Sequence, residues 1–77
     1  MIIHDLERND LEIAIGKMNE AVKIFNDLAA NSANTDFVAE MDETIFATTE
    51  LTQKVRDVKD EAKMIDFTEY HERYLRH

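Results

Sequence analysis

The amino-acid sequence predicts an all-α fold in which two long helices pack antiparallel as a hairpin. The 77 residues include no Pro and one Gly, so residues that form tight turns between strands are almost absent. Apolar residues make up 44% of the chain, an ordinary share for a globular protein. Many of them recur at the three- and four-residue spacing of a helix that packs along one side. We therefore expect a single helical domain over residues 1–77.

The first helix is predicted to span about residues 9–30. It is expected to begin at Asn9 or slightly earlier, because the Asn9 side chain accepts hydrogen bonds from free backbone N–H groups while Glu12, three residues on, reaches back. The turn is expected at residues of about 31–35, where short polar side chains bond to their own backbone. The apolar positions of the helix step by four and three residues: Leu11, Ile15, Met18, Val22, Phe25 and Ala29.

The second helix is predicted over residues of about 36–64, with Asn34 or Thr35 as its cap. Two spacings compete in the middle of its apolar stripe, where either Leu51 or Thr52 faces the first helix. We interpret Thr48 and Thr52 as structural residues whose hydroxyls bond back to the preceding helical turn. The stripe as a whole comprises Val38, Met41, Ile45, Thr48, Leu51 or Thr52, Val55, Val58, Ala62 and Ile65.

The C-terminal segment of about 67–76 forms either a short third helix or a continuation of the second. Asp66 and Glu69 have the spacing of a capping box, while the first helix is too short to cover residues beyond Ala62. A chain of this length rarely stabilises itself with one small core. Either the third helix folds back over the hairpin, or a second chain completes a four-helix bundle. The expected oligomer interface comprises Ile13, Ile24, Phe46, Met64, Ile65, Phe67, Tyr70 and Tyr74.

The formal net charge of −8 is concentrated around the turn. From Ile24 to Gln53 there are six acidic residues and no Lys or Arg. This distribution argues against direct contact with nucleic acid or an anionic membrane. It is typical of a solvated helix face, and it would also fit a basic protein partner. The candidate acidic surface, on the face opposite the core, comprises Asp36, Glu40, Glu43 and Glu50.

The histidines and carboxylates do not have the spacing that metal binding or catalysis requires. Glu69 and His71 are two residues apart and His71 and His77 are six apart, whereas metal ligands on one helix face need separations of three or four. The chain has no Cys and no glycine-rich phosphate loop. A two-helix hairpin encloses no pocket for acid–base catalysis. We expect no catalytic, cofactor-binding or metal-binding residues, and no enzyme activity.

The remaining expectation is a cytoplasmic protein that works by contact with other proteins. There is no apolar run long enough to cross a membrane and no signal-peptide pattern, and the absence of Cys fits a reducing compartment. The expected function is a small regulator, adaptor or assembly factor that forms a homo-oligomer, most simply a dimer, with coiled-coil-like packing. The alternative is an acidic inhibitor, of the type made by phages or plasmids, that occupies a basic nucleic-acid-binding site on its target.

Overall fold

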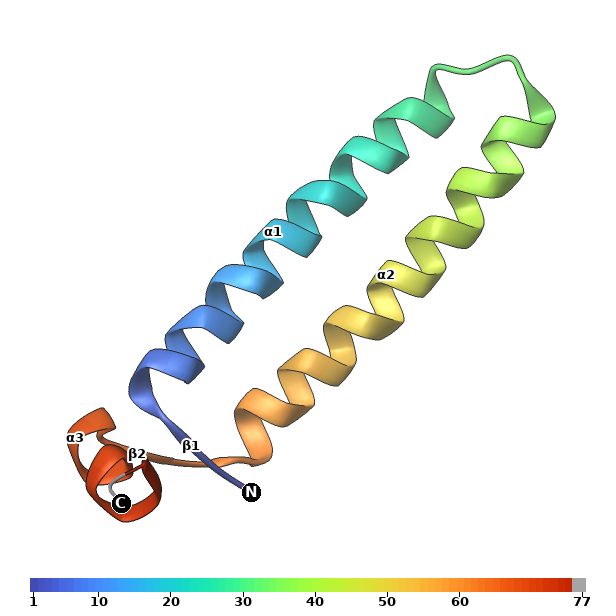
Figure 1. Ribbon diagram of the computed structural model, residues 1–77. Helices are drawn as coiled ribbons and strands as arrows, with labels where there is room; N and C mark the ends of the chain where they lie inside the picture. Colours follow the sequence, from blue (N-terminus) through green and yellow to red (C-terminus); the bar gives the residue numbers. More distant parts are fainter. Residues whose placement is uncertain (76–77) are drawn as a thin grey trace.

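A computed structural model describes residues 1–75 and shows a long hairpin of two helices (Figure 1). The turn lies at one end, and the N-terminus and the short C-terminal helix lie at the other. The molecule measures 57 × 20 × 16 Å. In chain order the elements are β1 (Ile2–His4), α1 (Asp5–Ala30), α2 (Thr35–Glu61), β2 (Lys63–Ile65), α3 (Phe67–Tyr70) and the short π-helical segment η1 (His71–Leu75).

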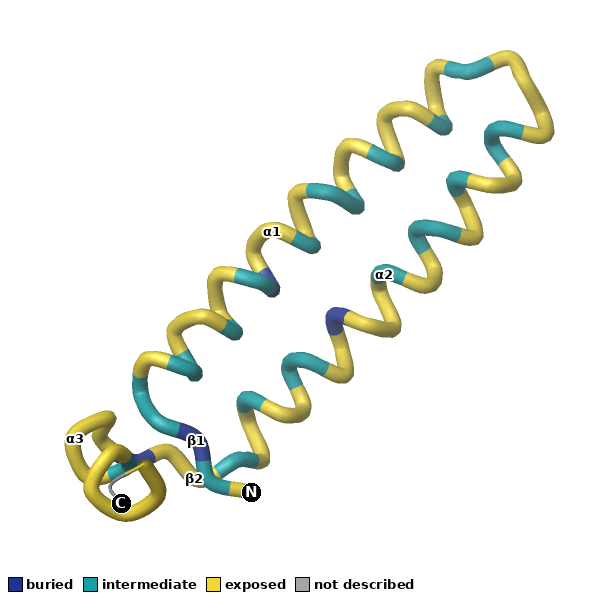
Figure 2. The backbone as a smooth tube through the Cα atoms, in the orientation of Figure 1, coloured by how far each residue is buried: buried dark blue, intermediate teal, exposed yellow. Residues whose placement is uncertain are grey.

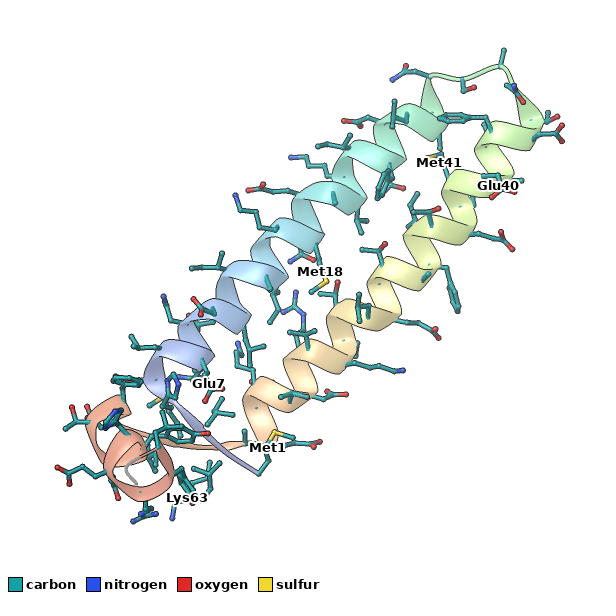
Figure 3. The ribbon with its side chains drawn as sticks, viewed as in Figure 1. Met1, Glu7, Met18, Glu40, Met41 and Lys63 are labelled. Atoms are coloured by element: carbon teal, nitrogen blue, oxygen red, sulfur yellow. The ribbon has the colours of Figure 1, made fainter. Side chains whose placement is uncertain are left out.

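The predicted apolar seam of α1 is confirmed by the pattern of burial. Ile15 is buried, and the other five predicted positions are half-buried. Figure 2 shows the covered residues of α1 and α2 on the sides that face one another. In Figure 3, Met18 of α1 and Met41 of α2 point into the space between the helices. The four–three spacing therefore places one continuous row of side chains against the other helix.

Helix α1 begins at Asp5, four residues before the predicted start at Asn9. His4 is the cap: its Nδ1 accepts a hydrogen bond from the Glu7 backbone N–H at 3.1 Å, and the His4 N–H donates to Glu7 Oε1 at 3.2 Å. The two bonds form a capping box, which usually has Ser or Thr in the position that His4 occupies. The cap at His4 was not identified because His is not among the residues that favour this position.

The turn joins the helices through side chains that bond the backbone. The Asn31 side-chain amide donates to the Asp27 carbonyl oxygen at 2.8 Å at the end of α1. At the start of α2, Asn34 Oδ1 accepts a bond from the Phe37 N–H at 3.1 Å. Asn34, one of the two predicted caps, therefore begins the second helix and reverses the chain.

Thr52, not Leu51, faces α1 in the middle of α2. Thr52 is 5% exposed, whereas Leu51 is 53% exposed. The Thr52 hydroxyl donates to the Thr48 carbonyl oxygen at 2.7 Å, which confirms the predicted bond to the preceding turn. Because this bond satisfies the hydroxyl within the helix, a polar residue is buried there without an unpaired group.

Thr52→Val is expected to raise the free energy of unfolding by about 1 kcal/mol. Val keeps the branched shape and removes a buried hydroxyl, and the Thr48 carbonyl still accepts the helical bond from the backbone N–H of residue 52. Thr49→Val is the matched control, since the Thr49 hydroxyl donates to Ile45 O at 2.8 Å but is exposed. Urea unfolding followed by circular dichroism compares the two. Equal effects would show that burial at position 52 is unimportant.

Helix α2 ends at Glu61, and the chain then forms a strand that the sequence analysis did not predict. β2 pairs in parallel with β1, with Ile2, Ile3 and His4 opposite Lys63, Met64 and Ile65. The Lys63 N–H also donates to the Met1 carbonyl oxygen at 2.9 Å. The predicted helical hairpin is confirmed, since the fold is mostly helical. It also contains a two-stranded parallel sheet, which was not predicted, at the end away from the turn. The predicted helix to residue 64 overran by three residues.

The N-terminal strand lies between the hairpin and the C-terminal segment. Ile3 is buried and lines a groove with Leu11 and Val58 of the two long helices. His4 points to the opposite face of the strand, as neighbouring residues of a strand do, and contacts Phe67 and Tyr70 edge-to-face, with ring centroids 4.9 and 4.8 Å apart. The N-terminus thus covers part of the apolar C-terminal segment.

The C-terminal segment forms a separate short helix, one of the two predicted alternatives. Asp66 caps α3 by accepting a hydrogen bond from the Thr68 N–H at 2.8 Å. Asp5 Oδ1 accepts another from the Phe67 N–H at 3.0 Å, which ties the start of α3 to the start of α1. Together with the strand pair, these bonds hold the two ends of the chain to each other.

Candidate protein-binding surfaces

The chain exposes more large apolar side chains than it buries. Within residues 1–75, the buried apolar residues are Ile3, Ile15 and Ile65, each 7–8% exposed. Twelve other large apolar residues are at least 37% exposed. Single exposed apolar residues are common on protein surfaces, so their arrangement decides whether they form a binding surface.

The two sides of the hairpin differ in composition. Because the helices are antiparallel, the residues that directly precede the seam positions lie along one side, and those that directly follow them lie along the other. We call the first the apolar side: Asp10, Ala14, Lys17, Ala21, Ile24 and Leu28 of α1, and Glu40, Thr44, Ala47, Leu51, Lys54 and Val58 of α2. We call the second the polar side: Glu12, Gly16, Asn19, Lys23, Asn26 and Ala30 of α1, and Asp42, Phe46, Thr49, Gln53, Arg56 and Asp60 of α2.

Shallow grooves between the helices support this division. One groove is lined by Asp10 and another by Leu28. These residues are 18 apart in the sequence, or five helical turns, so the two grooves open to the same side. A third groove is lined by Asn19. Asn19 is nine residues, or two and a half helical turns, from both Asp10 and Leu28, so this groove opens to the opposite side. The first two grooves include Ile24, Leu28, Phe37, Met1, Ile3, Leu11 and Val58. The third is lined by Asn19, Val22, Thr49, Thr52, Gln53 and Arg56.

The apolar side carries four large side chains that no other part of residues 1–75 covers fully. Their exposed fractions are 59% for Ile24, 44% for Leu28, 53% for Leu51 and 37% for Val58. The polar side has one such residue, Phe46, at 66%. Four exposed apolar residues aligned along one side of a hairpin are typical of a helix-packing interface.

The residues predicted as an oligomer interface are dispersed by the fold. Ile24 lies on the apolar side, whereas Ile13 is 52% exposed and lies about 160° around α1 from Ile15. Ile65 is 8% exposed, so its own chain covers it. The other C-terminal candidates are half-buried or exposed: Met64, Phe67, Tyr70 and Tyr74. The sequence analysis missed Leu28, although its position directly before Ala29 of the seam was an available signal. Val58 was predicted in the seam, but it is 37% exposed and Lys59 is half-buried in its place. Leu51, the alternative to Thr52, is exposed.

The predicted acidic row is exposed on α2. Asp36, Glu40, Glu43 and Glu50 all lie on its solvent-facing surface. Phe46 is three residues after Glu43 and four before Glu50, a spacing that makes the three side chains neighbours on a helix. Phe46 and Glu43 also line a shallow depression with Asp42. Asp42, Glu43 and Glu50 thus place carboxylates beside an exposed aromatic ring.

The histidines described by the structure lie against other side chains. Within residues 1–75, no three His, Cys, Asp or Glu side chains lie close enough to hold a metal ion. His4 is engaged in the cap of α1, and His71 lies against the Phe67 ring at 6.1 Å. His77, the remaining histidine of the sequence analysis, lies outside the described residues. None of the helices described is long and apolar enough to cross a membrane.

The fold therefore defines a two-helix hairpin whose open end is tied by a parallel strand pair and whose two sides differ in polarity. No protein-family model matches this chain, and neither the curated proteins nor the solved structures compared with it give a match.

Proposed function

We propose that this chain is a non-enzymatic protein–protein interaction module that works as a regulator, adaptor or assembly factor within a helical bundle. The observation that supports this function is the one-sided exposure of Ile24, Leu28, Leu51 and Val58. Complete burial of a Leu, Ile or Val side chain contributes about 1.5–3 kcal/mol. Another helical surface placed on the apolar side would gain part of that energy from each residue.

The small size of the chain's own core supports the same function. Only three apolar residues among the described 75 are buried, and they lie in two places, Ile15 in the hairpin and Ile3 with Ile65 at the strand pair. Small domains without disulfides or metals commonly gain stability from a partner. Binding therefore serves both the stability of the hairpin and its function.

A photo-reactive amino acid placed at Leu51 or at Gln53 tests this function in the cells that make the protein. Both positions are exposed on α2, but Leu51 is on the apolar side and Gln53 on the polar side. We expect Leu51 to form discrete protein cross-links, with its own chain or with another, and Gln53 to form few. Equal cross-linking at the two positions, or none at Leu51, would contradict the proposed function.

A second candidate function is inhibition of a basic nucleic-acid-binding protein, and Phe46 among its neighbouring carboxylates favours it. A row of carboxylates can substitute for the charges of a phosphate backbone, and an exposed aromatic ring can anchor the contact. In capture experiments with the immobilised protein, Glu43→Lys with Glu50→Lys should abolish binding of a basic target, and heparin should compete. Glu12→Lys with Glu20→Lys on α1 is the charge-matched control. A target that both double variants retain equally at moderate salt would refute inhibition.

A further inference from the structure

The charges on the apolar side are placed symmetrically along α2. Glu40 and Lys54 are each seven residues, or two helical turns, from Ala47, and all three are exposed. Neither charged residue forms a salt bridge within residues 1–75. If a second α2 crossed the first antiparallel about Ala47, Lys54 of each helix would lie opposite Glu40 of the other.

We propose that the occupant of the apolar side is a second copy of this chain, packed with its turn at the opposite end of the bundle. This inference rests on the proposed function and names its partner. Each α2 then lies against α2 of the partner subunit and each α1 against its counterpart, in a four-helix arrangement. Two symmetric ion pairs join Lys54 of one subunit to Glu40 of the partner subunit.

The distribution of charge favours this orientation over one with both turns at the same end. Residues 24–53 contain six acidic residues, and all nine Lys and Arg residues lie outside that range. Turns at the same end would place two strongly acidic ends side by side. Turns at opposite ends place each acidic end beside the part of the partner that contains its basic residues, which reduces repulsion.

The shape of the apolar side suits a close contact. Near its middle lie the small residues Ala21 on α1 and Ala47 on α2, beside the exposed Lys17. Small residues allow helices to approach to the usual 8–10 Å. The larger Leu28 and Val58 lie toward its two ends. A hairpin 57 Å long and 20 Å across has room for the roughly 800 Å² per partner that a stable interface buries.

Cysteine cross-linking tests the orientation, because the natural chain has no Cys. With a short bismaleimide, Ala47→Cys should form a covalent dimer, since position 47 lies beside the two-fold axis. Gln53→Cys, on the polar side, should not. Dimers formed only when Ala47→Cys is mixed with Ala21→Cys would show turns at the same end and overturn the proposed orientation. An absence of cross-links in every mixture would overturn the second copy as partner, while cross-links from Leu51 to another protein would leave the proposed function intact.

Charge exchange tests the ion pairs. Lys54→Glu alone and Glu40→Lys alone should each weaken dimerisation about tenfold, because both symmetric pairs become repulsive. An equal mixture of the two variants should form heterodimers of restored affinity. Lys23→Glu, which makes the same change of charge on the polar side, should leave the dimer unchanged. Equal dimerisation constants for Lys54→Glu and Lys23→Glu, measured by sedimentation at low salt, would contradict the pairing.

Discussion

Replacement of Ile15 by Ala is expected to lower the free energy of unfolding by about 2–5 kcal/mol. Ile15 is the one apolar side chain of the two long helices that is buried within the described residues. Truncation removes its contacts with α2 and leaves a cavity that two rigid helices fill poorly. Because a domain of this size has a stability of similar magnitude, the variant should lose much of its helical circular dichroism at room temperature.

Ile13→Ala is the matched control for Ile15→Ala. The two residues belong to the same helix and undergo the same change, but Ile13 is 52% exposed and points away from α2. We expect its effect to stay within about 0.5 kcal/mol, as for other surface substitutions. All variants are compared at one protein concentration, since association would add to the apparent stability. Similar losses for both variants would show that the seam does not stabilise the hairpin.

Replacement of Ile65 by Ala is expected to have the second large effect, also about 2–5 kcal/mol. Ile65 is 8% exposed and lies opposite His4 in the parallel strand pair. Its loss weakens the contact between the two ends of the chain, on which the position of α3 depends. Limited proteolysis should then cut near Lys63 faster than in the natural protein, and urea unfolding should begin at lower concentration.

Met64→Ala is the control for the strand pair. Met64 precedes Ile65 in the same strand but is 48% exposed, so its replacement should cost less than about 1 kcal/mol. If Met64→Ala and Ile65→Ala changed proteolysis and unfolding equally, the strand pair would not hold the C-terminal segment in place.

The long helices could be predicted from the sequence because their signals are local. The four–three spacing from Leu11 to Ala29 identified the seam of α1, and the polar cluster around Asn34 identified the turn. The choice between Leu51 and Thr52 could not be made from spacing alone. Apolar character favoured Leu51, but the hydroxyl of Thr52 is satisfied within its own helix, which lowers the cost of burying it without removing that cost.

The strand pair could not be predicted because its two halves are some 60 residues apart. Ile2 and Ile3 contain no turn signal, and β1 is only three residues long. Its partner strand follows directly on a helix that the sequence pattern continued to residue 64. The role of His4 was missed for a related reason: the contacts of its ring with Phe67 and Tyr70 depend on that long-range pairing.

The candidate surfaces were predicted in part. The exposure of Asp36, Glu43 and Glu50 follows from their position opposite the core of α2, whereas Glu40 is exposed on the apolar side. The apolar side could not be predicted without knowing which residues form the seam. Leu51 turns outward to the same side as Val58 and Ile24 only when Thr52 faces α1. The C-terminal residues were expected to need a second chain, and the structure places the N-terminal strand against part of them instead.

The most direct test of the proposed dimer is the molar mass of the purified chain, measured by light scattering coupled to size-exclusion chromatography from low to high micromolar concentration. We expect twice the 9.0 kDa of one chain, with the dimer favoured as concentration rises and weakened by Lys54→Glu. A folded, helical species of 9.0 kDa over the whole range would contradict the account.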